Sequence, residues 1–173
     1  MKRTWMLIPA LAALLAGGVP TNAQELTRTE RQVRKEIVTL PYLSVFDNIE
    51  FRVDGDKVTL MGQVTRPTLK SGAERVVEDI EAVGKVDNQI EVLPVSPNDD
   101  RVRQAVARAI YYHPSFTRYS FQAIPPIRIV VKNGDVTLKG VVNSKFEKNV
   151  AGVQANGVAG VFSVMNDLQV ERD

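Results

Sequence analysis

A short stretch that occurs twice constrains the fold of this chain more than any other feature of its sequence. The first copy, from Gly55 to Val64, reads GDKVTLMGQV, and the second, from Gly134 to Val142, reads GDVTLKGVV. In both copies apolar residues recur at every second position, a pattern typical of a half-buried β-strand. Leu60 and Leu138 are 78 positions apart, and their neighbours align at the same offset. The repeat therefore predicts two equivalent structural units in tandem.

Each unit is predicted to fold in the order helix, strand, strand, helix, strand. The first helix opens with Thr27 or Thr29 as its N-cap, and Glu30 follows Thr27 at the spacing of a capping box. The helix stops before Pro41. A strand, a turn at Gly55 and the repeated strand then form a hairpin, followed by a second amphipathic helix. A last strand over residues 86–93 returns beside the hairpin through a right-handed crossover.

The second unit begins with a helix that Asn98 or Asp99 is expected to cap. Its last helix is expected over residues 144–156, where Gly152 weakens it, because a mid-helix glycine costs about 1 kcal/mol relative to alanine. This helix is therefore predicted to be shorter or more mobile than its counterpart in the first unit. Its inward side is predicted to consist of Phe146, Val150 and Val153.

Two glycines of the repeated strand, Gly62 and Gly140, have the same parity as its buried apolar residues. Each is therefore predicted to face the core. There the missing side chain either lets a helix pack close to the sheet or permits a bulge. We interpret both glycines as structural rather than functional.

The second unit carries nine extra residues between its first helix and its hairpin, within residues 111–126, and five aromatic residues lie in this segment. Arginines on the preceding helix and the rings that follow it combine attraction for anionic headgroups with side chains suited to an interface. The alternative interpretation is that Tyr111, Phe116 and Phe121 only pin the insertion onto the core. The candidate lipid-binding residues are Arg101, Arg103, Arg108, Tyr111, Tyr112, His113, Phe116 and Arg118.

Residues 1–23 have the composition of a secretory signal peptide. Two basic residues precede an apolar run that is too short to span a bilayer, and small residues end at Ala23, where we expect cleavage. The mature protein is expected to be exported, most simply to the periplasm, and soluble, with no transmembrane span. We divide it into residues 24–93, a proline-containing linker over 94–98, and residues 99–173 with the insertion at 111–126.

Charge is divided unequally between the two units. The formal net charge of +2 disappears when Lys2 and Arg3 leave with the signal peptide. Residues 24–95 then hold 10 basic and 13 acidic side chains, whereas residues 96–173 hold 10 basic and 7 acidic ones. The second unit is thus the one expected to meet an anionic surface. The neutral total and the export signal argue against nucleic acid as a partner.

The sequence does not indicate an enzyme. His113 is the only histidine and there is no cysteine, which excludes a HExxH site, a thiolate metal site, a disulfide and a lipid-anchoring cysteine. Glu78, Asp79 and Glu81 are acidic neighbours, but their spacing is typical of a solvated helix face. We therefore predict no catalytic residue, no metal and no cofactor.

Two motifs occur in both units: the VTL-x-G-x-V core, and the endings at 82–88 and 160–166, which are similar to a GV-x-x-V-x-N signature with Ala82 in place of the first glycine. In these residues the chain resembles the BON domain family, in tandem, of the osmotically inducible exported type. The resemblance implies an α+β fold in which two helices cover one face of a three-stranded mixed sheet. It also implies an exported envelope protein without catalytic residues that associates with phospholipid in osmotic or envelope stress. The alternative is a scaffold that binds envelope proteins through the exposed edges of its sheets.

Overall fold

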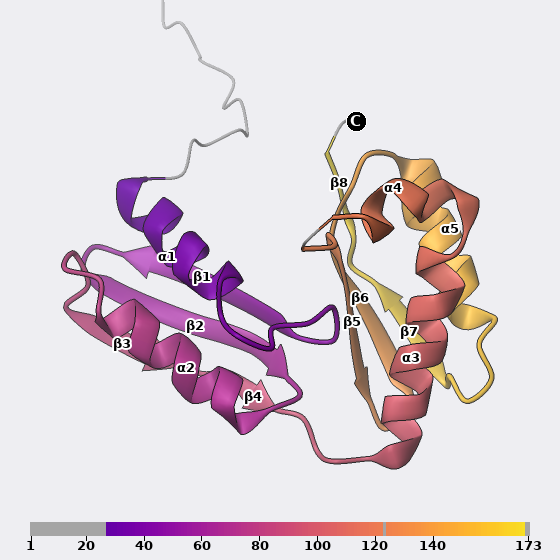
Figure 1. Ribbon diagram of the computed structural model, residues 1–173, viewed down its shortest axis with the longest axis horizontal. Coiled ribbons are helices and arrows are strands. Elements are labelled where there is room, and N and C mark those ends of the chain that lie inside the picture. Colours follow the sequence, from indigo (N-terminus) through magenta and orange to yellow (C-terminus); the bar gives the residue numbers. More distant parts are fainter. Residues whose placement is uncertain (1–26, 123, 172–173) are drawn as a thin grey trace, which may run out of the picture.

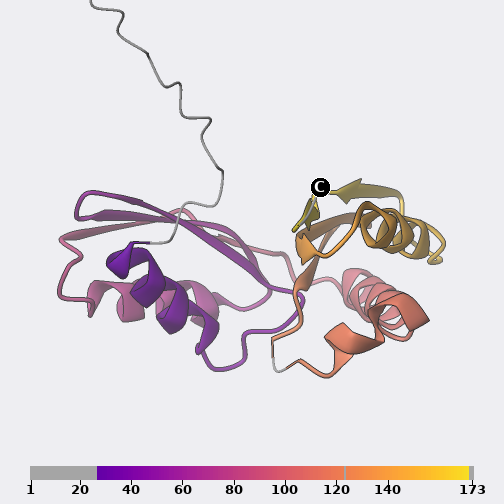
Figure 2. The same cartoon turned by 90° about the horizontal axis from the view of Figure 1, so that it is seen from above.

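The computed structural model of the 173-residue chain describes residues 27–122 and 124–171, so the predicted signal peptide lies outside the described residues. Two α+β repeats follow each other along the chain. Each consists of one small mixed sheet with two main helices packed on one of its faces (Figure 1 and Figure 2). The predicted fold class, two tandem α-β-β-α-β units, is confirmed.

In the first repeat, β2 is the central strand. It pairs antiparallel with β1 on one side and parallel with β3 and β4 on the other. The predicted capping box is present at the start of α1, where Thr27 and Glu30 each accept a hydrogen bond from the other's backbone N–H. The elements are α1 (Arg28–Val38), β1 (Asn48–Asp54), β2 (Lys57–Val64), α2 (Pro67–Glu78), β3 (Lys85–Asn88) and β4 (Glu91–Val92).

The second repeat has the same topology, with β6 at its centre. The predicted insertion folds as a 3-10 turn, η1, and one short helix, α4, after the end of α3. The elements are α3 (Pro97–Tyr111), η1 (Pro114–Phe116), α4 (Thr117–Ser120), β5 (Ile127–Lys132), β6 (Asp135–Val142), α5 (Lys145–Asn156), β7 (Ser163–Asn166) and β8 (Gln169–Val170).

The cores of the two repeats are built from equivalent positions of the central strands. Their side chains face the two helices and are at most 1% exposed. These positions are Val58 and Val136, Leu60 and Leu138, and Val64 and Val142. The alternation read from the sequence therefore identifies the buried face of both sheets.

The last strand of each repeat is broken by an asparagine rather than continuous as predicted. In the first repeat, Asn88 donates from Nδ2 to the carbonyl oxygen of Lys70 at 3.0 Å, and its Oδ1 accepts from the N–H of Ile90 at 3.2 Å. Asn166 makes the equivalent bonds in the second repeat, to Lys148 and Leu168. The asparagine of the GV-x-x-V-x-N ending thus bridges the break and ties the strand to the second helix of its repeat.

Gly62 and Gly140 lie at the point where the neighbouring chain approaches the central strand most closely. Their φ angles are +109° and +114°. A Cβ atom on Gly62 would lie 2.1 Å from the carbonyl oxygen of Asn48, and one on Gly140 would lie 1.9 Å from that of Pro126. At both positions the absence of a side chain thus accommodates the adjacent backbone and not a helix.

The last helix differs from its prediction in both length and orientation. With 12 residues, α5 is as long as α2, so the expectation of a shorter helix is wrong. Its buried residues are Glu147, Ala151 and Ala155. Phe146 and Val153, which we expected to face inward, are 67% and 69% exposed.

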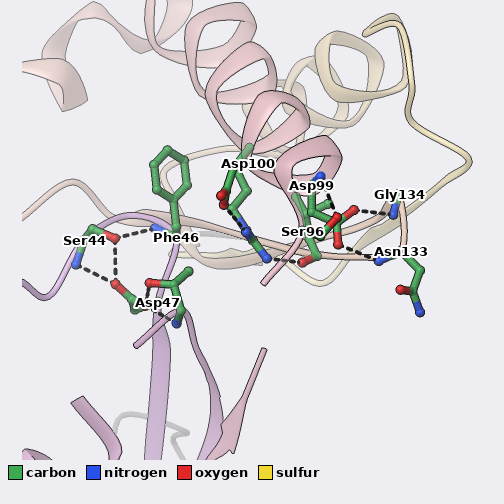
Figure 3. Close-up of polar contacts among 11 residues, drawn as sticks. Ser44, Phe46, Asp47, Ser96, Asp99, Asp100, Asn133 and Gly134 are labelled. Carbon is green, nitrogen blue, oxygen red and sulfur yellow. Dashed lines mark hydrogen bonds and ion pairs between the residues drawn. The ribbon is translucent and has the colours of Figure 1, made fainter. Parts of the chain in front are cut away.

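The cap of α3 also differs from its prediction. Ser96 caps the helix, because its side chain accepts from the N–H of Asp99 and Pro97 occupies the first turn, where no N–H is needed. Asp99 instead is buried, and its carboxylate accepts from the N–H groups of Asn133 and Gly134, both at 2.9 Å (Figure 3). It thereby fixes the β5–β6 turn against α3.

The loop before β1 docks on the free edge of β5 and connects the two repeats. The N–H of Ile129 donates to the carbonyl oxygen of Val45 at 2.7 Å, and Arg128 Nη1 donates to that of Ser44 at 2.9 Å. The ring of Phe46 packs against the core of the second repeat (Figure 3). Asp47 is buried and holds the loop in shape by accepting hydrogen bonds from Ser44 and, across the hairpin, from Thr65.

Two ion pairs also join the repeats, and in both the cation comes from the second repeat. Lys132 Nζ lies 2.6 Å from Glu91 Oε1, and Lys139 Nζ lies 2.8 Å from Glu50 Oε1. The hydrogen bond from Lys139, with a smaller contribution from Asn48, lowers the pKa of Glu50. The signs match the excess of acid in the first half and of base in the second.

We expect Gly140→Ala to lower the free energy of unfolding by about 3 kcal/mol, because its Cβ would overlap a backbone carbonyl and its φ angle is strained for other residues. Gly55→Ala is the matched control. That glycine also has a positive φ, of 62°, but no atom lies within 4 Å of its Cβ position, so the loss should be about 1 kcal/mol. Urea unfolding followed by circular dichroism measures both, and equal losses would contradict the role given to the Pro126 carbonyl.

Phe46→Ala should loosen the docking of the loop on β5. The amide of Ile129, which donates to Val45, should then exchange with deuterium at least about tenfold faster, as expected for about 1.4 kcal/mol of lost packing. The amide of Leu138, inside the central strand, serves as the internal control and should be unaffected. Unchanged exchange at Ile129 would show that Phe46 does not hold the repeats together.

Candidate functional site

Three of the predicted lipid-binding residues lie together on the outward side of α3. Arg101 and Arg108 are exposed, Tyr112 is 81% exposed, and their spacing of seven and then four residues places them on one side of the helix. The opposite side of α3 is buried through Val102, Val106 and Ile110. We call Arg101, Arg108 and Tyr112 the α3 stripe.

Arg103 does not belong to this surface. It is 3% exposed, and its guanidinium donates from Nη2 to the carbonyl oxygen of Val131 at 2.6 Å and pairs through Nη1 with Asp100 at 2.5 Å. Its Nε has no partner within the described part of the chain. Arg103 therefore joins α3 to β5 and, in this structure, cannot reach a headgroup.

Most rings of the insertion are anchors. Phe116 is fully buried in the core of the second repeat, and the half-buried Tyr111 donates from its hydroxyl to the carbonyl oxygen of Ile127 at 2.6 Å. Burial raises the pKa of Tyr111. His113 accepts from the N–H of Ser115 at 3.2 Å and so caps η1. Phe121, by contrast, is 86% exposed.

Arg118 is bound to a buried polar cluster that the sequence analysis did not identify. Its guanidinium contacts the carboxylate of Glu147 and lies 4.9 Å from the centroid of the Tyr119 ring. The hydroxyl of Tyr119 donates to Glu147 at 2.8 Å, and the N–H of Asn143 donates to the same oxygen at 2.9 Å. Burial and the bond to Glu147 raise the pKa of Tyr119. The cluster fastens the insertion to the start of α5.

The outward sides of α3 and α5 form the helical face of the second repeat, and its charge is positive. The acidic residues of these two helices are Asp99, Asp100 and Glu147, and each of them is engaged by the contacts described above. The basic residues include Arg101 and Arg108 on α3 and Lys145 and Lys148 on α5. This arrangement can attract an anionic surface.

Two further observations concern residues 27–122 and 124–171, which the structure describes. In that part of the chain, no group of three or more His, Cys, Asp or Glu side chains is placed to hold a metal ion. Nor does any helix there have the length and apolar character needed to cross a bilayer.

The chain matches the BON domain family twice, over residues 25–94 and 98–172. It belongs to the BON domain family. This membership supports a membrane- or envelope-associated role without catalysis.

Solved structures similar to the chain include one of CdsD, a structural protein of the type III secretion system of Chlamydia trachomatis, with 13% identity, a TM-score of 0.33, and coverage of 83% of this chain and 92% of that one. The C-terminal domain of CdsD gives 13% identity, a TM-score of 0.30, and coverage of 84% and 98%. No curated protein matches the chain.

Replacing rings of the insertion should separate its anchors from its surface residues. Phe116→Ala should lower the free energy of unfolding by about 3–5 kcal/mol, because it leaves a cavity in the core. Phe121→Ala, at an exposed ring of the same segment, should change it by no more than about 0.5 kcal/mol. Urea titration tests both variants. A small effect of Phe116→Ala would show that this ring does not anchor the insertion.

Proposed function

We propose that this BON domain protein is exported and associates weakly and reversibly with anionic phospholipid surfaces of the cell envelope. Its role would be envelope maintenance or the response to osmotic or envelope stress, without catalysis. The observation that carries the proposal is the α3 stripe: Arg101, Arg108 and Tyr112 are exposed on one side of a helix whose carboxylates are already engaged. A cationic, ring-bearing surface is suited to anionic headgroups.

The proposed binding is weak because charge alone supplies little free energy. Each basic residue near an anionic membrane contributes about 1 kcal/mol, so an excess of three charges gives about 3 kcal/mol. Millimolar affinity already requires about 4 kcal/mol. Binding should therefore be sensitive to salt, and it needs an apolar contribution in addition.

The proposed location rests on the leader. Removal of residues 1–23 after Ala23 would release a chain that begins just before α1 and contains every described element. Such processing would place the protein in the periplasm, facing membrane surfaces that carry anionic lipid.

A scaffold for envelope proteins is the second candidate function, and one observation favours it. The edge of β5 accepts a turn of the first repeat, because the N–H of Ile129 donates to the carbonyl oxygen of Val45, so a sheet edge of this fold does bind a neighbouring segment. Phe51 occupies the equivalent edge position of β1 in the first repeat. A partner protein with an extended segment could dock there.

Reversal of the two arginines tests the lipid proposal. The double variant Arg101→Glu, Arg108→Glu should reduce binding to anionic vesicles at low salt by at least about 100-fold, because a change of four charges is worth about 4 kcal/mol at such a surface. Flotation with anionic and with neutral vesicles, at low and at high salt, measures it. The wild-type chain should bind only anionic vesicles, and mainly at low salt.

The matched control is Lys35→Glu with Arg75→Glu, two exposed cations on the helices of the first repeat. It changes the total charge by the same amount and should retain most of the binding. If both double variants lose binding equally, net charge and not the α3 stripe is responsible. If the wild-type chain does not float with anionic vesicles even at low salt, the lipid proposal fails.

A further inference from the structure

An apolar stripe runs along the outward side of α5. Phe146 is 67% exposed and Val153 is 69% exposed, and Val150 is half-buried between them. Residues 146, 150 and 153 are separated by four and three positions, which places them on one side of the helix. The opposite side, with Ala151 and Ala155, is in the core. We call Phe146, Val150 and Val153 the α5 stripe.

The first repeat shows that the fold does not require apolar residues at these positions. At the offset of 78, the equivalents of the α5 stripe in α2 are Thr68, Gly72 and Arg75. The two helices have the same length and pack on the same face of equivalent sheets. The exposed side chains of Phe146 and Val153 are thus a property of the second repeat, and packing within the repeat does not explain them.

The α5 stripe adjoins the cationic surface of α3. The two helices pack against each other on one face of the sheet, so their outward sides form one continuous surface (Figure 1). On this surface the α3 stripe provides two guanidinium groups and a phenol, and α5 adds Lys145, which directly precedes Phe146. The one acidic residue of α5, Glu147, is 7% exposed and bound to Arg118.

We propose that the α5 stripe is the apolar anchor of a membrane-binding face, and that Phe146 and Val153 insert between the headgroups of an anionic bilayer while α3 contacts the phosphates. This inference rests on the proposed function, and it supplies the apolar contribution that charge alone lacks. A bilayer fits better than a protein groove, because the exposed apolar groups share one helical face with Arg101, Arg108 and Lys145, and a membrane interface binds both kinds of side chain. Each inserted side chain would raise the affinity about 10- to 100-fold.

Tryptophan fluorescence tests the insertion directly. The only tryptophan of the chain, Trp5, lies in the predicted signal peptide, so a chain that begins at Gln24 has none and still contains every described element. In that chain Phe146→Trp gives one reporter on α5. With vesicles of anionic phospholipid at low salt, its emission should shift to shorter wavelength, and lipids brominated in the acyl chain should quench it.

Tyr42→Trp is the control reporter, because Tyr42 is an exposed ring of the first repeat, 73% accessible and outside the helical face of the second repeat. The emission of this tryptophan should stay at the wavelength typical of an indole ring in water. Equal shifts at both positions would overturn the assignment of insertion to α5.

Affinity gives an independent measurement. Phe146→Ser with Val153→Ser should weaken binding to anionic vesicles at least about 100-fold and leave the urea midpoint unchanged, since both side chains are exposed. Phe121→Ser, which removes an exposed ring outside the α5 stripe, should bind like the wild-type chain.

The outcomes separate the two proposals. Salt-sensitive binding with no shift at Phe146→Trp and no loss in the double serine variant would overturn the α5 anchor and leave the proposed function standing. No binding of the wild-type chain to anionic vesicles would overturn both. A wild-type dimer in analytical ultracentrifugation that becomes monomeric in the double serine variant would show that a second copy covers the α5 stripe, and would also overturn the anchor.

Discussion

The packing of one central strand against two helices is the interaction on which each repeat depends. Leu60 and Leu138 lie at the middle of these strands and are fully buried. In each repeat, the helix that precedes the hairpin and the helix that follows it both contribute to the core around this leucine. This requirement keeps the inward positions of the two repeats alike. The outward positions of the helices have no such role in the core, and it is there that the repeats differ most, as at Arg75 and Val153.

Docking of the repeats uses a different part of the fold, the edge of a sheet. An edge strand offers unpaired N–H and C=O groups, and proteins usually cover or blunt such edges. Here the loop before β1 covers part of the β5 edge through Val45 and Ile129, and buried Asp47 stiffens that loop. This loop belongs to the first repeat and covers part of an edge strand of the second, so it holds the two repeats together.

The sequence was sufficient to predict the class and order of both repeats, because strand alternation and helix periodicity are local signals. It was not sufficient to predict the orientation of α5. A stripe of Phe146, Val150 and Val153 has the spacing of a buried face, and a glutamate beside it is normally solvated. The helix is instead turned so that Glu147 faces inward, toward Tyr119. Tyr119 lies 28 residues before Glu147 in the chain, so no local pattern could reveal this pair.

The same limit applies to the candidate site. Of the three arginines predicted on α3, Arg101 and Arg108 lie on one side of the helix, opposite its apolar residues. Arg103 and Phe116 are buried because of contacts with β5 and with the core, which only the tertiary structure defines. The aromatic segment therefore divides into anchors and exposed residues, and composition alone treats these as equivalent.

The two uses of positive charge in the second repeat do not compete, because the sheet separates them. Lys132 and Lys139 alternate with the core residues of β5 and β6, so they project from the face that the helices leave open, and there they pair with glutamates of the first repeat. The arginines of the α3 stripe project from the opposite, helix-covered side. A bilayer on the helical face would thus leave the docking of the repeats intact. The first repeat, with its excess of acid, would be held on the side away from the anionic surface, where like charges repel least.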